Sequence, residues 1–357
     1  MTEPRLRAGI LGASGYGGAG LIERLSRHAG VRIAALGSRQ YLGQSVDACW
    51  PQFAGLLDLR FGDEDEVIAA SDVLFCATPH GATAPIVEKA IGAGVAVVDL
   101  SADFRLDAAT YQTWYGAAHP CPDLIPQARY GLVELHRSEL VGCRLVASPG
   151  CNATAASLAL APLAAAGLLG PSAVATVLAG VSGAGRSPGA AYTFTEVNEN
   201  VRAYKPSGTH RHTGEIEATL GRVRLDGKDL TTHSDFEPYT VSFTPHLVPL
   251  TRGILATCTT RPHDAELDDE SLLGIFRDYY AGDPLIHVQA DLPQTKAVAG
   301  SDRAILSVRY DPRSRHIVAF CVVDNLGKGA AGQAVQGFNV AFGFDETEGL
   351  SMAGTWP

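Results

Sequence analysis

The chain has 357 residues, of which 46% are hydrophobic and 18% charged, and its formal net charge at pH 7 is −10. A chain of this length and hydrophobicity can bury at least one large core and is expected to form two domains, which excludes disorder along its whole length. The acidic charge argues against binding to nucleic acid or to an anionic membrane, although a local basic pocket can still hold a small anion.

The start of the chain has no basic segment followed by an apolar core, and the first expected strand begins almost at once. No apolar run reaches the ~18 residues of a membrane span. We therefore expect a cytoplasmic protein with no signal peptide and no membrane partner. The seven cysteines are scattered without a CxxC pair, which is typical of reduced thiols and predicts no metal site.

The first part of the chain alternates short apolar runs with helical stretches. Strands are expected at 6–11, 31–36, 73–77, 95–100 and 145–147, and helices at 18–28 and 84–93. Strands separated by helices pair in parallel through right-handed crossovers. Residues 1–150 are therefore predicted to form an α/β domain of the Rossmann type, with a doubly wound parallel sheet.

A glycine-rich loop, GILGASGYGG over residues 9–18, follows the first expected strand and precedes the first helix. In a dinucleotide-binding loop Gly12 would permit the tight turn, Gly15 would let the backbone approach a pyrophosphate, and the Ser14 hydroxyl would donate to a phosphate oxygen. We predict that the segment Gly12-Ala13-Ser14-Gly15 binds a nicotinamide dinucleotide. The alternative is a glycine-rich turn without a ligand.

The residues after the second expected strand indicate which dinucleotide binds. An NAD site usually carries an acidic residue about 20 positions after the glycines. Here the chain reads LGSRQ over residues 36–40, without an acid. Ser38 and Arg39 suit a 2′-phosphate, so NADP is the predicted cofactor. The alternative is that Arg39 is an ordinary solvated arginine.

A cysteine lies where the strand 145–147 meets an alanine- and leucine-rich stretch, about 152–166, that is predicted to be a helix. Backbone N–H groups and the dipole at a helix N-terminus favour an anion, and such a position lowers the pKa of a thiol from its usual value of about 8.5. Cys151 is therefore the candidate nucleophile. The six other cysteines are expected to be small core or surface residues.

Beyond about residue 170, strands follow one another with fewer helices between them, at 174–181, 239–244, 254–260, 304–310 and 317–323. This pattern predicts a second α+β domain, residues 151–324, with a mostly antiparallel sheet. The long polar stretch 182–215 is expected to be functional or to form an interface. The segment 325–357, with a helix at about 329–342, is expected to complete the nucleotide domain.

The segment His210-Arg211-His212 offers two imidazoles and one cation within three residues. A cysteine nucleophile beside a nicotinamide suggests acyl chemistry, which needs an acid or base near the sulfur. One imidazole can fill that role while Arg211 meets a substrate anion. The alternatives are a basic surface loop and a two-histidine metal site, for which no third ligand is evident.

Eight motifs, in chain order, make the sequence similar to the N-acetyl-gamma-glutamyl-phosphate reductase family. They are GASGY (12–16), DLSADFRL (99–106), PGC (149–151), SGAGR (182–186), EVNEN (196–200), YK (204–205), HRHT (210–213) and DNLGKG (324–329). The resemblance implies a Rossmann domain joined to an α+β substrate domain. It also implies reduction of a small-molecule acyl phosphate, N-acetyl-glutamyl 5-phosphate, by NADPH in arginine biosynthesis, with release of phosphate and the semialdehyde.

The same resemblance implies a role for individual residues. Cys151 would be the nucleophile and His212 the acid or base, with His210 as the second choice. Contacts to NADP would come from Ser14, Gly15, Ser38 and Arg39, from Ser182 and Gly183 on the nicotinamide side, and from Asn325. Arg105 and Arg211 would bind substrate phosphate or carboxylate, although Arg105 is equally expected to form a structural ion pair with Asp99 or Asp103.

Two departures from the family pattern leave the substrate open. Asn152 replaces an aromatic residue common in the arginine-pathway members, and residues 204–208 are similar to the sister enzyme of lysine biosynthesis. That enzyme reduces an aminoadipyl phosphate carried on a small acidic protein. An NADP-binding sensor without turnover is the alternative from another class. The family pattern also implies a homodimer or homotetramer.

Overall fold

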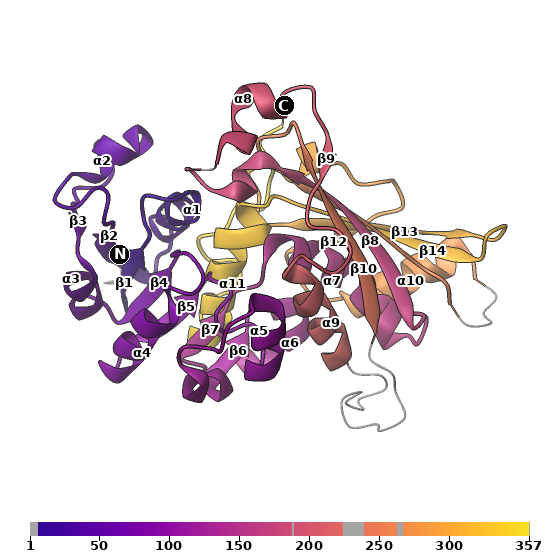
Figure 1. Cartoon of the computed structure of the whole chain (residues 1–357), viewed down its shortest axis with the longest axis horizontal. Helices are drawn as coiled ribbons and strands as arrows, with labels where there is room; N and C mark the ends of the chain where they lie inside the picture. The colour runs from indigo at the N-terminus through magenta and orange to yellow at the C-terminus, as the bar shows by residue number, and fades with distance from the viewer. Residues whose placement is uncertain (1–5, 188, 224–238, 263–266, 357) are drawn as a thin grey trace. The chain divides into compact units, whose positions relative to one another are not determined.

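The computed structural model describes residues 6–187, 189–223, 239–262 and 267–356 (Figure 1). The chain divides into two compact units. The first comprises Met1–Pro149 and Ala330–Ser351, and the second comprises Gly150–Gly329 and Met352–Pro357.

The first unit is built on a seven-stranded sheet in the order β3-β2-β1-β4-β5-β7-β6, and every pair in it is parallel. Its strands are β1 (Leu6–Leu11), β2 (Val31–Gly37), β3 (Phe61–Gly62), β4 (Val73–Cys76), β5 (Ala96–Asp99), β6 (Ala128–Tyr130) and β7 (Leu145–Ala147). The order reverses between β1 and β4, which is where such sheets bind dinucleotides. The predicted doubly wound Rossmann-type sheet is confirmed.

Helices cover both faces of this sheet. They are α1 (Tyr16–Leu25), α2 (Val46–Cys49), α3 (Glu64–Ala69), α4 (Ala84–Gly92), α5 (Ala108–Tyr115), α6 (Val133–Leu140) and α11 (Gly332–Phe342). Successive strand residues face opposite sides, so Phe75 of β4 joins the core cluster beneath α1 and α11, whereas Leu74 joins the cluster beneath α3 and α4.

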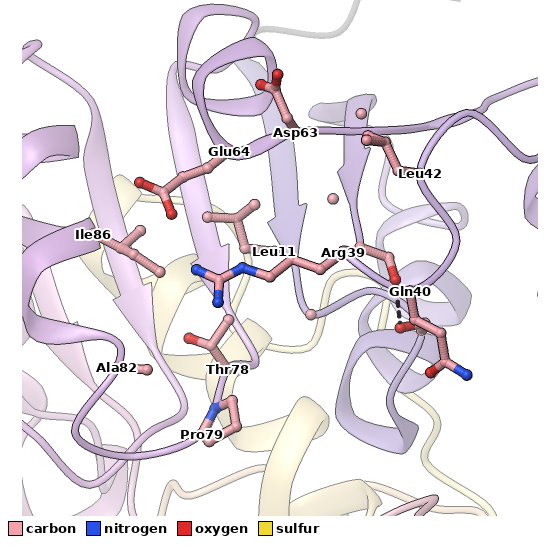
Figure 2. A pocket seen from close by; sticks show the side chains of 15 residues that line it. Leu11, Arg39, Gln40, Leu42, Asp63, Glu64, Thr78, Pro79, Ala82 and Ile86 are labelled. Atoms are coloured by element: carbon pink, nitrogen blue, oxygen red, sulfur yellow. Dashed lines mark hydrogen bonds between the residues drawn. The ribbon is translucent and has the colours of Figure 1, made fainter.

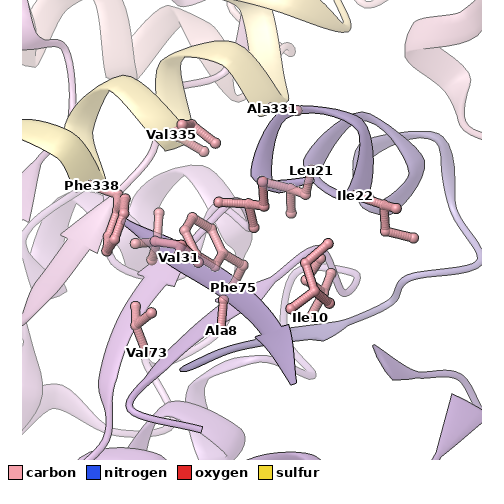
Figure 3. Close-up of a cluster of buried hydrophobic side chains, with 14 of the residues drawn as sticks. Ala8, Ile10, Leu21, Ile22, Val31, Val73, Phe75, Ala331, Val335 and Phe338 are labelled. Carbon is pink, nitrogen blue, oxygen red and sulfur yellow. The ribbon is translucent and has the colours of Figure 1, made fainter. Parts of the chain in front are cut away.

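Helix α11 belongs to this first unit although it lies near the end of the chain. It packs against α1 and places Val335 and Phe338 beside the strand residues Val31 and Phe75 (Figure 3). The rings of Phe338 and Phe75 are 5.4 Å apart in an edge-to-face arrangement, a favoured geometry for aromatic pairs. The core beneath the parallel sheet of the first unit therefore includes residues that follow β2 by about 300 positions in the chain.

The second unit contains a seven-stranded mixed sheet in the order β12-β13-β14-β11-β8-β10-β9. Its strands are β8 (Ser172–Gly180), β9 (Arg202–Ala203), β10 (Thr240–Val248), β11 (Ile254–Thr260), β12 (Ile286–Val288), β13 (Ala304–Asp311) and β14 (His316–Val323). Four of the six strand pairs are antiparallel, which confirms the predicted mostly antiparallel sheet. The parallel pairing of β8 with β10 follows from the long connection between them.

The central helix of this unit is α7 (Cys151–Ala165), and it is accompanied by α8 (Phe194–Val197), α9 (His212–Arg222) and α10 (Asp269–Tyr279). The alanine and leucine residues of α7 from Ala153 to Ala164 are buried all round, and the helix packs against β11, β14 and α9. Pro162 lacks the N–H that would bond to the carbonyl of Leu158, and the Tyr280 hydroxyl donates to that carbonyl instead, at 2.6 Å. The helix therefore continues past Pro162 without a break, and Cys151 is its first residue.

Candidate active site

The glycine-rich loop between β1 and α1 has a backbone that only glycine allows at two positions. Gly12 has a φ of +74°, and a Cβ there would lie 2.3 Å from the carbonyl oxygen of Ala77. A Cβ on Gly18 would lie 2.5 Å from the carbonyl oxygen of Gly12. Gly15 donates its N–H to Gly12 at 3.0 Å and Ala13 donates to Gly37 at 3.1 Å, so the loop is tight and tied to β2.

A cavity of about 590 Å³ opens beside this loop, at the ends of β1, β2 and β4 (Figure 2). Four predicted cofactor residues line it: Gly12, Ser14, Ser38 and Arg39. The hydroxyls of Ser14 and Ser38 are 2.8 Å apart. The side chain of Arg39 extends across the cavity toward Thr78 and Ile86 (Figure 2). The first unit therefore combines a glycine cradle, two hydroxyls and a guanidinium in one pocket.

Sequence reasoning missed the segment after β4, which contributes Thr78, Pro79 and Ala82 to the cavity. The buried carboxylate of Asp103 holds this segment by accepting hydrogen bonds from the N–H groups of Gly81, at 2.7 Å, and Ala84, at 3.1 Å. A polar residue directly after an apolar parallel strand was the available signal, because ligands bind at the carboxyl ends of such strands.

Cys151 is the first residue of α7, in the second unit, and its side chain is half-buried. The preceding N–H, of Gly150, donates to the buried carboxylate of Glu215 at 2.7 Å. A Cβ on Gly329 would lie 3.0 Å from the Cβ of Cys151, so only a glycine backbone fits against the cysteine without a shift. The roles of Glu215 and Gly329 were not foreseen from the sequence.

The other cysteines differ from Cys151 in burial. Only Cys151 and Cys143 are half-exposed, and the remaining five are buried. Burial raises the pKa of Cys258 to about 12 and that of Cys76 well above its usual value. Burial also raises the pKa of Cys143. Because the thiolate is the reactive form, these groups are unsuited to nucleophilic attack at neutral pH.

The two predicted histidines lie together at the start of α9. The Nδ1 atom of His210 accepts the backbone N–H of His212 at 3.1 Å, and the ring centroids are 4.6 Å apart. The ring of His210 also packs 5.2 Å from that of Phe243. Burial, followed by the charges of His212 and Lys205, lowers the pKa of His210 to about 3. His210 is therefore neutral at physiological pH, with Nδ1 already used as an acceptor.

Tyr204 connects the histidine segment to the cysteine turn. Its ring lies 5.6 Å from that of His210, and its hydroxyl accepts a hydrogen bond of 3.4 Å from the buried amide of Asn152. Burial, and then the negative charge of Cys151, raises the pKa of Tyr204 to about 12. The phenol stays protonated near the sulfur and is able to donate a hydrogen bond there.

The predicted residues Ser182, Gly183 and Asn325 also meet in the second unit. The side chain of Asn325 donates to the Ser182 hydroxyl and accepts the N–H of Gly253, both at 2.8 Å. A Cβ on Gly183 would come within 3.8 Å of the Asn325 amide nitrogen. Asn325 thus ties the turn after β8 to the segment before β11.

The two predicted anion-binding arginines occupy different settings. Arg105, in the first unit, is 8% exposed, and its guanidinium donates to the carbonyls of Ser148, at 2.7 Å, and Leu100, at 2.9 Å. Arg211, in the second unit, is half-buried and precedes the first residue of α9. Within the described ranges, no three His, Cys, Asp or Glu side chains are grouped as a metal site. No helix of the described part of the chain is long and apolar enough to cross a membrane.

The neutral state of His210 predicts a specific dependence of stability on pH. An unfolded chain protonates this histidine below about pH 6.5, whereas the folded chain does not until about pH 3. The unfolded state therefore binds more protons in this window, and stability should fall as pH drops through it. The substitution His210→Asn removes the titration and should flatten that fall, measured by urea unfolding at several pH values. An identical slope in both proteins would contradict the assignment.

Comparison with known protein families gives two matches along the chain. Residues 7–142 match the family described as "Semialdehyde dehydrogenase, NAD binding domain". Residues 151–325 match the family described as "Semialdehyde dehydrogenase, dimerisation domain". The two ranges together cover most of the chain.

Curated relatives match over nearly their full length. The chain is 49% identical to N-acetyl-gamma-glutamyl-phosphate reductase of Thermus thermophilus, over 98% of this chain and 100% of that protein. It is 45% identical to the protein of the same name from Desulforudis audaxviator, over 99% of this chain and 100% of that protein.

Solved structures with the same fold are also found. Aspartate semialdehyde dehydrogenase II of Vibrio cholerae, complexed with ASA, aligns with a TM-score of 0.70 at 20% identity, over 95% of this chain and 98% of that one. Aspartate semialdehyde dehydrogenase of Candida albicans, with NADP, aligns with a TM-score of 0.66 at 19% identity, over 94% and 98%. At these identities the likeness is one of fold.

Proposed function

The chain belongs to the semialdehyde dehydrogenase family, and we propose that it reduces N-acetyl-glutamyl 5-phosphate to the 5-semialdehyde and phosphate, with NADPH, in the cytoplasm. The reaction is a step of arginine biosynthesis. The observation that carries the proposal is a half-exposed cysteine at the first residue of α7, joined through Tyr204 to a histidine pair. A sensor without turnover would need neither of these features.

The chemistry assigned to the chain begins at Cys151. Its thiolate attacks the acyl carbon, the bond from that carbon to the phosphate oxygen breaks, and phosphate leaves with the electron pair, so that a thioester remains. The hydride for the reduction of this thioester would come from NADPH when it is bound. His212 donates a proton to the carbonyl oxygen as the thioester is reduced. It takes the same proton back when the bond between the Cys151 sulfur and the carbon breaks and the aldehyde leaves.

The cavity of the first unit fits a nicotinamide dinucleotide. The collisions that a Cβ on Gly12 or Gly18 would make with neighbouring backbone reflect the tight glycine turn expected of such a loop. The Ser14 hydroxyl with the N-terminus of α1 suits a pyrophosphate. Ser38 and Arg39 lie at the end of β2 and support a 2′-phosphate contact, hence NADP rather than NAD. Ser182, Gly183 and Asn325 are assigned to the nicotinamide side, and Arg211 to a substrate anion.

Replacing Arg39 tests the choice of cofactor. Arg39→Ala removes the guanidinium that pairs with the 2′-phosphate, so the ratio of kcat/KM for NADP to that for NAD should fall by about 10- to 100-fold. Steady-state kinetics with both cofactors measure this ratio. Arg27→Ala, which changes an exposed arginine paired with Glu23 on α1, is the matched control. An unchanged ratio in Arg39→Ala would remove the assignment.

One assay tests the proposed substrate. The purified protein is given phosphate, NADP and N-acetylglutamate semialdehyde, and, in a parallel reaction, the aminoadipate semialdehyde attached to its carrier protein. We expect NADP reduction with the free N-acetylated substrate. Activity with the carrier-linked substrate alone would identify the protein as the enzyme of lysine biosynthesis. Activity with neither substrate would favour an NADP-binding sensor without turnover.

The sheet of the second unit supports assembly into a homodimer. The strands β8, β10, β11 and β14 contain no Asp, Glu, Lys or Arg. On the face of the sheet away from α7, their side chains are nonetheless exposed or half-exposed, and they include Val174, Thr176, Thr244, Thr257, Val318 and Phe320. An uncharged sheet face with apolar side chains is typical of a surface covered by a partner. A second copy of this chain is the proposed partner.

Thr257 pairs with Thr176 and Phe320 in the middle of this face, so Thr257→Lys places a charge at the centre of the proposed interface. Sedimentation velocity should show a dimer, or a tetramer of such dimers, for the native protein and a smaller species for the variant. Gln112→Lys, on an exposed position of α5, should leave the mass unchanged. A monomeric native protein would contradict the proposal.

A further inference from the structure

The backbone that leads into Cys151 is held by side chains from distant parts of the chain. In the first unit, the Nε of Arg105 donates to the carbonyl of Ser148 at 2.7 Å, and the side-chain amide of Gln333 donates to the carbonyl of Pro149 at 2.8 Å. Arg105 is 8% exposed and Gln333 is fully buried. Two consecutive carbonyls just before the nucleophile are therefore each fixed by a buried donor.

The next backbone group is held within the second unit. The N–H of Gly150 donates to the Glu215 carboxylate at 2.7 Å, and Glu215 is 2% exposed. The carbonyl of Gly150 accepts the side-chain hydroxyl of Thr154 at 3.1 Å and its N–H at 2.8 Å. Each of the three residues that precede Cys151 thus has a backbone group fixed by a side chain from another element.

The kind of side chain used here is informative. Buried backbone groups need partners, but neutral ones suffice. Burying a guanidinium and a carboxylate costs desolvation free energy, which their hydrogen bonds offset only when the geometry is good. Buried charged groups therefore contribute little net stability. Charged donors and acceptors do form shorter and more directional hydrogen bonds than neutral ones. Directional bonds of this kind restrict the orientation of the turn more than neutral ones would.

We propose that Arg105, Gln333 and Glu215 are positioning residues that clamp the turn 148–150, so that the sulfur of Cys151 is presented to the substrate in a single orientation. This inference rests on the proposed role of Cys151 as nucleophile. In this role the Nε and Nη2 atoms of Arg105 donate to the carbonyls of Ser148 and Leu100. A shift of the sulfur by about 1 Å would cost roughly 10²-fold in rate.

The first test compares Arg105→Met with Arg105→Lys and with Gln333→Leu. Loss of either donor should lower kcat by about 10- to 100-fold, leave the KM for the acyl phosphate within about twofold, and alter the rate and pH profile of Cys151 alkylation by iodoacetamide. Arg105→Lys retains one donor and should lose less than Arg105→Met. Arg137→Met removes an arginine that pairs with Glu346 and is the control for a general loss of stability.

The second test separates the charge of Glu215 from its hydrogen bond. Glu215→Gln keeps an oxygen that accepts the N–H of Gly150, whereas Glu215→Ala removes it. We expect Glu215→Ala to lose at least tenfold more kcat than Glu215→Gln, with the alkylation profile altered most in Glu215→Ala. Equal losses in the two variants would overturn the clamp at this residue.

The remaining outcomes are distinct from failure of the proposed function. A rise of tenfold or more in substrate KM for Arg105→Met, with an unaltered alkylation profile, would make Arg105 a substrate ligand and overturn its positioning role. If Gln333→Leu folds and keeps its native kcat, the clamp is also overturned. Failure of the proposed function would instead appear in the native protein, as full activity after alkylation of Cys151.

Discussion

Cys151→Ser is expected to lose phosphate-dependent oxidation of N-acetylglutamate semialdehyde by a factor on the order of 10³ or more, while it still binds NADP. The hydroxyl is a much weaker nucleophile than a thiolate at neutral pH, and an oxygen ester would replace the thioester. The rate of NADPH formation is measured by absorbance. Fluorescence titration gives the affinity for the cofactor. The geometry behind this expectation is the place of Cys151 at the first residue of α7.

Cys143→Ser is the matched control for this variant. Cys143 is the other half-exposed cysteine, and its thiol donates to the carbonyl of Leu145 at 3.2 Å, a bond that a serine hydroxyl can keep. Its activity should stay within about twofold of the native value. Activity of Cys151→Ser within tenfold of native would refute covalent catalysis by this residue, even if the substrate assignment were right.

His212→Asn should lower kcat by about 10²- to 10⁴-fold and leave the affinity for NADP nearly unchanged. The reason lies in the contrast between the two imidazoles. His210 is neutral down to about pH 3, and its Nδ1 accepts the backbone N–H of His212. It is therefore poorly suited to donate a proton at neutral pH, and the acid–base role is assigned to His212.

His210→Asn provides the comparison, because the amide oxygen of asparagine can also accept the N–H of His212. We expect it to lose less than tenfold in kcat. In His212→Asn the pH profile of kcat/KM should lose the limb that reports ionisation of the acid–base histidine, whereas His210→Asn should keep it. A larger loss in His210→Asn than in His212→Asn would reverse the assignment.

Much of the candidate site could be predicted because it depends on local rules. The expected strand 145–147 coincides with β7, and the expected helix start differs from that of α7 by one residue. Gly12 occupies the positive φ that the turn requires. The pairing of Ser38 and Arg39 with the glycine loop followed from parallel strands ending at one edge of a sheet. These features need only neighbours in sequence or the general geometry of a parallel sheet.

Four of the short strands were not predicted, although β7, which also has three residues, was expected from the apolar run 145–147. Strands β3 and β9 have two residues each, and β6 and β12 have three. So few residues display no alternation of apolar and polar side chains. They are strands because an existing edge offers unpaired backbone groups, which is a property of the assembled sheet.

By itself the sequence determined the Rossmann-type order of strands and helices, the glycine loop and the start of the helix that carries Cys151, because spacing and residue type act over short range. Only the tertiary structure decided which side chains hold that cysteine. Every residue has a backbone carbonyl or N–H, so nothing in the sequence marks Ser148 as the partner of Arg105, or Gly150 as the partner of Glu215. Such contacts exist only once distant elements have packed, since burial is what makes an unpaired backbone group costly.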